Sequence, residues 1–118
     1  MRPRLAWVPA AIARHRGPQP EHLDVFLAAG ALCLSLRLAH GRWQEQAPHR
    51  RRYLSYSGPL SAGRGAVAIC WRGLGRLRRT SGGWQLELRR GCATARWLLA
   101  DGGIVRALGG RCSRDARR

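Results

Sequence analysis

Residues 22–38 read HLDVFLAAGALCLSLRL. Apolar residues recur at every second position on both sides of Gly30, which is the pattern of strands with one face in a core. The pair Ala29-Gly30 offers a turn between the two halves. We therefore predict a β-hairpin with strands over residues 22–28 and 31–38. The core-facing side of the first strand is Leu23, Val25 and Leu27.

The rest of the chain carries the same period-2 pattern in shorter pieces. Residues 66–71 (AVAICW), 83–91 (GWQLELRRG) and 92–100 (CATARWLLA) read as strands separated by glycines. In the first of these, Val67, Ile69 and Trp71 share one face. Residues 39–52 read as a polar loop, and residues 53–56 (YLSY) as a short strand. Without a long amphipathic helix, this pattern predicts an all-β fold, a small antiparallel β-barrel.

A chain of 118 residues can bury one core. We assign residues 1–108 to the β-barrel domain and residues 109–118 (GGRCSRDARR) to a basic, disordered tail. Residues 1–16 combine early arginines, a short apolar stretch and an Ala-Ile-Ala that mimics a cleavage site, so an export signal is an alternative there. No run approaches the ~18 apolar residues of a membrane span.

The charge is very unbalanced. The chain has 22 arginines, no lysine and only 6 acidic residues, which gives a formal net charge of +16. Such a charge repels itself in a compact fold, and an anionic partner relieves the repulsion. Guanidinium groups match phosphate oxygens, which favours nucleic acid as the partner. An anionic membrane surface is the alternative.

The four cysteines, Cys33, Cys70, Cys92 and Cys112, form no Cys-x-x-Cys pair. This spacing argues against a structural zinc site. The first three lie among apolar residues and read as buried thiols in a reducing compartment. We therefore expect a cytoplasmic protein.

His22 and Asp24 are separated by one residue within the first predicted strand. Residues i and i+2 of a strand point the same way, with Cα atoms ~6.6 Å apart. An imidazole and a carboxylate so placed suit zinc, manganese or iron. The alternative is an exposed polar face, since the opposite face already supplies the core side.

Residues 49–65, HRRRYLSYSGPLSAGRG, concentrate a histidine, three consecutive arginines, two tyrosines and a glycine-rich loop. Backbone amides of such a loop can approach a phosphate, and Arg64 can add a fork of donors. Tyrosines beside arginines can stack on nucleobases, as can Trp43 in the predicted polar loop. The alternative is a loop whose glycines only permit tight turns.

Taken together, these motifs resemble the phosphoesterase domain of bacterial DNA ligase D, and more closely its small stand-alone relatives. The resemblance covers roughly residues 5–100. The matching positions are His22 and Asp24, then His49 and Tyr53, then Gly58, Pro59, Ser61, Gly63, Arg64 and Gly65, with Trp71 in the following strand.

The resemblance implies a compact antiparallel β-barrel with a divalent metal, preferably manganese, in a groove. It implies removal of a 3′-phosphate or a terminal ribonucleotide from DNA to leave a 3′-hydroxyl for repair. His22, Asp24 and His49 would be the metal set, with His15 as a further ligand if one residue is inserted. Tyr53 would contact the phosphate or the metal shell. We expect Arg64, with Arg51 or Arg52 as the second choice, to neutralise charge on the phosphate oxygens. The implied partners are DNA 3′ ends, including RNA-containing ends, and a DNA ligase or polymerase, with the protein itself a monomer.

Three positions depart from the family pattern. Phe26 stands where ligase-linked members carry an arginine, Ser57 where a glutamate precedes the Gly-Pro, and Arg72 where an aspartate follows the tryptophan. Fewer carboxylates weaken the hold on a hard cation. A non-catalytic nucleic-acid-binding module with an eroded metal site is therefore the alternative function. A small exported or membrane-associated cationic protein is a third possibility.

Overall fold

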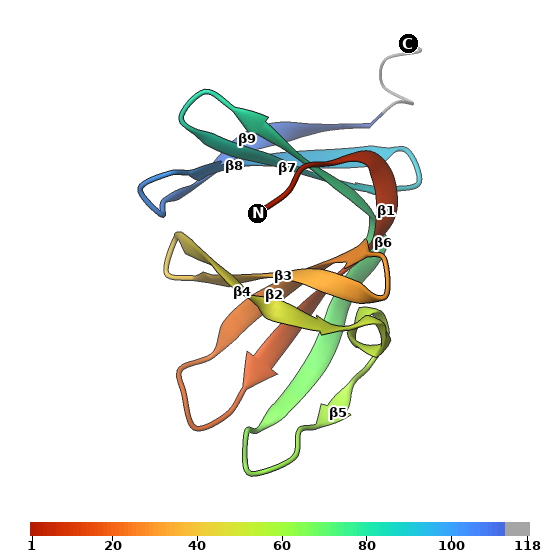
Figure 1. Ribbon diagram of the computed structural model, residues 1–118, viewed down its shortest axis with the longest axis vertical. Helices are drawn as coiled ribbons and strands as arrows, with labels where there is room; N and C mark the ends of the chain where they lie inside the picture. The colour runs from red at the N-terminus through yellow and green to blue at the C-terminus, as the bar shows by residue number, and fades with distance from the viewer. Residues whose placement is uncertain (113–118) are drawn as a thin grey trace.

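The protein is an antiparallel β-sheet protein, as the computed structural model shows for the residues that it describes, 1–112 (Figure 1). A 3-10 turn, η1, spans Arg51–Leu54. The strands are β1 (Arg4–Arg16), β2 (His22–Ala29), β3 (Leu32–Ala39), β4 (Arg42–Arg50), β5 (Gly58–Pro59), β6 (Ala66–Thr80), β7 (Gly83–Arg90), β8 (Ala93–Ala100) and β9 (Val105–Cys112). They form one sheet in the order β4-β3-β2-β1-β6-β7-β8-β9, with β5 paired to β6. The all-β antiparallel prediction is confirmed.

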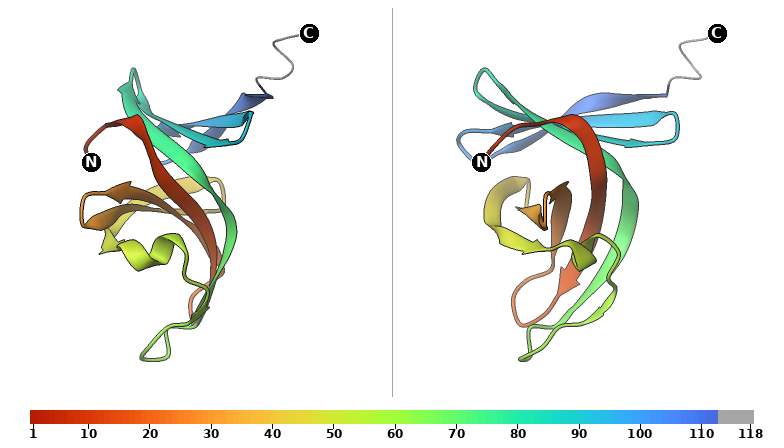
Figure 2. Two further views of the ribbon diagram at one scale, coloured as in Figure 1. Left: turned by 90° about the vertical axis from the view of Figure 1, so that its right-hand side faces the viewer. Right: turned by 45° about the vertical axis from the view of Figure 1, so that its right-hand side comes forward.

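The sheet curls into two layers that share β1 and β6. Strands β2–β4 form one layer and β7–β9 the other, while the long, bent β1 and β6 run through both (Figures 1 and 2). These two strands have 13 and 15 residues and pair along most of their length. A register shift between Ile12 and Ala13 marks an irregularity in that pairing, and such bulges increase local bend and twist.

An apolar main core fills the space between the layers. Its buried members are Ala10, Val25, Leu27, Leu36, Leu77, Leu86, Leu88 and Leu99. They come from strands of both layers, which explains why the period-2 alternation in the sequence is clean: one face of each strand points inward. A second cluster, formed by Ala13, Phe26, Cys33 and Val67 with Tyr53 and Leu54 against it, lies on the other face of β2 and β3 beneath η1.

The two edge strands, β4 and β9, meet at one end only. Arg42 forms an isolated bridge with Ile104, and the Trp43 amide donates to the Gly103 carbonyl (2.9 Å). The indole N–H of Trp43 donates to the carbonyl of Ala100 (2.7 Å). The sheet is therefore curled but not closed, and "barrel" describes it only loosely. Trp43 therefore lies in a strand at this junction and packs against the main core, not in a loop, and its stacking on bases stays a prediction.

The predicted hairpin is confirmed, with Gly30 at φ +65° and Ala29 paired to Leu32. The strands predicted near residues 83–91 and 92–100 are also present as β7 and β8. The polar loop predicted over residues 39–52 is wrong, because most of it is β4. An edge strand has one free side and exposed side chains, so its sequence needs no apolar alternation.

Two further predictions differ from the structure. Residues 51–54 form η1, so the predicted strand over 53–56 is wrong. The predicted common face of residues 66–71 breaks at Trp71, which packs on the main core while Val67 and Ile69 join the second cluster. The register shift in the β1–β6 pairing causes this change of face.

The two ends of the chain also differ from expectation. β1 lies in the middle of the sheet, so loss of residues 1–16 as an export signal would remove a central strand. β9 extends to Cys112 and so includes the first four positions of the expected tail 109–118; residues 113–118 lie outside the described part. No helix within residues 1–112 has the length and apolar character needed to span a membrane.

The cysteines do not fit the prediction of three buried thiols. Cys33 is fully buried, Cys70 is exposed, and Cys92 is disulfide-bonded. Since disulfides persist mainly in oxidising compartments, the cysteines give no support to a reducing one.

Candidate metal centre

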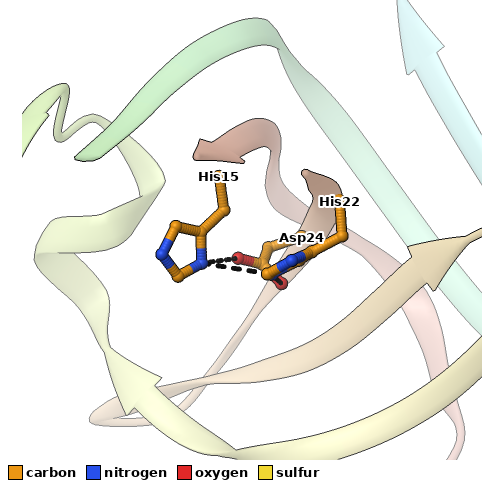
Figure 3. A group of neighbouring side chains, drawn as sticks. All are labelled: His15, His22 and Asp24. Atoms are coloured by element: carbon orange, nitrogen blue, oxygen red, sulfur yellow. Dashed lines mark hydrogen bonds and ion pairs between the residues drawn. The ribbon is translucent and has the colours of Figure 1, made fainter. Parts of the chain in front are cut away.

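Three side chains on two neighbouring strands converge at one point. His15 of β1 is the direct cross-strand partner of His22 in β2, and Asp24 follows two residues later on the same face. His15 Nδ1 lies 3.1 Å from His22 Nε2 and 3.7 Å from an Asp24 carboxylate oxygen. His22 Nε2 lies 3.3 Å from the other Asp24 oxygen. Figure 3 shows the two rings turned toward the carboxylate, so these three side chains could hold a metal ion.

Hydrogen bonds on the outer side of each ring fix which nitrogen faces the centre. His15 Nε2 donates to the carbonyl of Arg64 (2.9 Å), and His22 Nδ1 donates to the carbonyl of Pro20 (3.3 Å). A carbonyl can only accept, so the N–H of each neutral ring is on the outer nitrogen. His15 Nδ1 and His22 Nε2 then present lone pairs toward each other and toward a carboxylate. In this assignment of the tautomers no proton lies between the three acceptors, which favours a bound cation, and the carbonyl contacts match the outer shell typical of metal-bound histidines.

A close contact between two backbone segments positions the Arg64 carbonyl. Gly65 has φ +90°, and a Cβ there would collide with the carbonyl oxygen of Arg16 at the end of β1. Only glycine allows the loop to approach β1 this closely. The glycine-rich loop, in which we expected amides directed at a phosphate, therefore supplies a carbonyl to His15.

His22 and Asp24 are buried, with 6% and 8% of their surface exposed. The interpretation of this strand face as an exposed polar one is therefore wrong. Burying imidazoles and a carboxylate is unfavourable unless each polar atom is compensated. A cation would provide that compensation for all three at once.

The cluster lines a cavity of about 260 Å³. The same cavity is lined by the other residues predicted for the site, His49, Tyr53 and Arg64, and by Phe26 and Arg37. The structure therefore gathers residues from β1, β2, β3, β4, η1 and the loop after β5 at one place.

His49 lies in this cavity but outside the compact ligand group of His15, His22 and Asp24. Its Nδ1 lies 2.6 Å from the hydroxyl of Ser35, which is 1% exposed. Within residues 1–112 that ring is the hydrogen-bond partner found for the Ser35 hydroxyl. We assign the hydroxyl as the donor, which places the proton of a neutral His49 ring on Nε2 and leaves that nitrogen without a lone pair for a metal. The predicted set of His22, Asp24 and His49 thus differs from the observed group, in which His15 takes the third place.

An aromatic wall adjoins His49. The ring centroids of Phe26 and Tyr53 lie 5.4 Å and 5.5 Å from that of His49, and 6.0 Å from each other. Tyr53 also meets Tyr56 edge-on at 5.8 Å. Packing against these rings restricts the His49 side chain.

Arg64 is exposed, and its guanidinium donates to the carbonyl and the hydroxyl of Ser61, both at 3.0 Å. Its side chain is thus held within its own loop. The backbone carbonyl of Arg64 contacts the candidate metal centre, at His15.

Sequence reasoning missed Arg37. It lies in β3 directly opposite Asp24, lines the cavity, and has a buried Nε with no hydrogen-bond partner. The predicted hairpin contained the signal, because the pairing of Ala29 with Leu32 places residue 37 opposite residue 24.

A scan against protein-family models finds no match to this chain, and a search of curated proteins also finds none.

Proposed function

We propose that this protein is a metal-dependent phosphoesterase that trims 3′ ends of nucleic acid in DNA repair, removing a 3′-phosphate or a terminal ribonucleotide. The observation that carries the proposal is the convergence of His15 Nδ1, His22 Nε2 and the Asp24 carboxylate, with the outer N–H of each ring bound to a carbonyl. The resemblance of the sequence motifs to the ligase D phosphoesterase domain selects the reaction among those that such a centre could support.

The donor set fits a divalent transition metal, and we propose manganese. Two neutral imidazoles and one carboxylate are ligands that manganese, iron and zinc accept. Three protein ligands leave coordination positions for substrate and water. When bound, the ion supplies Lewis-acid chemistry: it polarises a phosphoryl oxygen and makes a water molecule more acidic.

The remaining residues of the cavity would bind the phosphate and move a proton. His49, with its lone pair accepting from Ser35, has Nε2–H available to donate to a phosphoryl oxygen or to the leaving group. Tyr53, whose ring packs beside His49, would add a hydroxyl donor. Arg64 would contribute to phosphate binding from the rim once it leaves Ser61.

The partner proposed is DNA, including ends that carry ribonucleotides. A net charge of +16 favours sequence-independent contacts with phosphates. Repair of such ends would place the protein in the cytoplasm, acting as a monomer before a DNA ligase or polymerase.

A 3′-end assay tests the proposal. A labelled duplex with a 3′-phosphate, or with a single 3′-ribonucleotide, is incubated with manganese and wild type, His22→Ala or His40→Ala. His40 is an exposed turn residue outside the cavity, which makes its substitution a matched control. We expect wild type and His40→Ala to produce the 3′-hydroxyl, and His22→Ala to produce none.

If wild type converted neither the 3′-phosphate nor the 3′-ribonucleotide end, the proposed enzymatic activity would be wrong. If the same duplex were then bound in a salt-dependent way, the non-catalytic binding module would be the better description. If His22→Ala were as active as wild type, the proposed metal centre would have no part in the reaction.

A further inference from the structure

We propose that Arg37 forms an anion subsite next to the metal cluster and takes an oxygen of a phosphate ester. The inference rests on the proposed function, because the phosphate that Arg37 would hold is the one on which the metal centre acts. It adds a residue that none of the sequence motifs includes.

Arg37 is placed beside the cluster by strand pairing. Its Cα is the cross-strand partner of the Asp24 Cα in the β2–β3 ladder. Directly opposed residues of an antiparallel pair share a face, with Cβ atoms ~4.5–5.5 Å apart. Both side chains line the same cavity.

Arg37 nevertheless does not pair with Asp24. The Asp24 carboxylate lies against His15 and His22, and none of the ion pairs found among residues 1–112 includes Arg37. Asp24 is thus directed to the cation position, while the neighbouring guanidinium has no carboxylate.

The donors of Arg37 are almost unused. Its hydrogen bond within residues 1–112 is a long one, from Nη1 to the Gln19 side-chain oxygen at 3.4 Å. Its Nε is buried and has no hydrogen-bond partner. A guanidinium has five donors in a planar fork that matches two oxygens of a phosphate.

Another partly buried arginine shows how this fold satisfies a guanidinium for structural purposes. Arg76 donates from Nε and Nη2 to the two carboxylate oxygens of Glu87, at 3.1 and 3.2 Å. Arg37 has the same need and no such partner. A buried donor without a partner destabilises the protein. Because this donor lies in a cavity beside the candidate metal site, it indicates a ligand whose oxygen atoms would accept the hydrogen bond.

The test compares Arg37→Met with Arg106→Met, an exposed arginine of β9 that provides the same change of charge. Thermal unfolding is followed in manganese with increasing inorganic phosphate. Without phosphate, Arg37→Met should unfold at or above the wild-type temperature, because an unsatisfied buried donor has been removed. With phosphate, wild type and Arg106→Met should rise in unfolding temperature. Arg37→Met should bind phosphate at least about tenfold more weakly, the effect of losing one charge-assisted hydrogen bond.

Two results would overturn the inference: a phosphate response in Arg37→Met equal to that of wild type, or no response in wild type. Manganese binding, measured separately by calorimetry, keeps the two proposals apart. If wild type and Arg37→Met bind manganese equally and also bind phosphate equally, only the Arg37 subsite fails. If wild type binds no manganese but its phosphate response still depends on Arg37, the subsite stands and the metal centre fails.

Discussion

The two faces of β2 differ in how they are buried. On one face Val25 and Leu27 are completely buried in the main core, against leucines from both layers of the sheet. On the other face His22, Asp24 and Phe26 are almost as inaccessible, at 6%, 8% and 2% exposure. That face adjoins a cavity and the smaller second cluster.

Within the eight residues of β2, one face stabilises the fold and the other carries candidate metal ligands. The main-core face stabilises the fold through close packing of apolar side chains. Even a small loss of side-chain volume there is therefore destabilising. The cavity face keeps imidazoles and a carboxylate away from water, where their electrostatic interactions are stronger. One strand therefore anchors the fold and carries two of the three candidate ligands.

The largest expected effect comes from breaking the packed face. Leu27→Ala should lower the free energy of unfolding by about 2–5 kcal/mol, because it leaves a void in the main core. Leu32→Ala, at a position that is 44% exposed on the neighbouring strand, should change it by less than ~0.5 kcal/mol. Urea denaturation measures both. Equal losses in the two variants would contradict the assignment of the core face.

Changing the cavity face should remove the metal and leave the fold. Asp24→Asn keeps the shape of the side chain but removes the charge, so manganese affinity should fall at least about 100-fold. The free energy of unfolding of the metal-free protein should change by less than ~1 kcal/mol, because no packed volume is lost. Calorimetric titration with manganese gives the affinity, and Asp101→Asn at an exposed turn is the control. Unchanged affinity in Asp24→Asn would be incompatible with the candidate centre.

A smaller effect should follow from the Ser35 hydroxyl, which sets the proton position of His49. Ser35→Ala should leave manganese affinity unchanged within about threefold, because His49 lies outside the compact group of candidate ligands. The catalytic rate should fall about 10–100-fold, since the donor at Nε2 is no longer fixed. Nitrogen NMR shifts of the His49 ring report the tautomer directly. If Ser35→Ala lost manganese binding, His49 would have to be counted among the metal ligands.

The smallest effect concerns two thiols, of which Cys33 is buried and Cys70 is exposed. Burial raises the pKa of the Cys33 thiol, an effect that nearby Arg51 reduces, whereas Cys70 is exposed. The thiolate is the reactive form, so Cys70 should be labelled first and Cys33 only slowly in the folded protein at pH 8. Mass spectrometry of labelled peptides gives the order. Because the folded-state pKa of Cys33 is raised, its effect on stability is absent at low pH and becomes destabilising as the pH rises above the ordinary thiol pKa.

Much of the fold follows from local pattern alone. The alternation in residues 22–38 is enough to define the hairpin, since period 2 with a central glycine has one simple solution. The strands β7 and β8 follow in the same way. β4 could not be predicted, because an edge strand with exposed faces carries no apolar period. The extents of β1 and β6 depend on their mutual pairing across more than fifty residues of sequence.

For the candidate site, local spacing is enough to predict two of the ligands: His22 and Asp24 share a strand face because they are two residues apart. The histidine that completes the group depends on strand pairing. Spacing in the sequence favours His49 over His15, yet β1 pairs with β2 and places His15 opposite His22, whereas His49 Nδ1 lies against the Ser35 hydroxyl. Proton positions and cross-strand neighbours arise from contacts distant in sequence, and no local pattern encodes them.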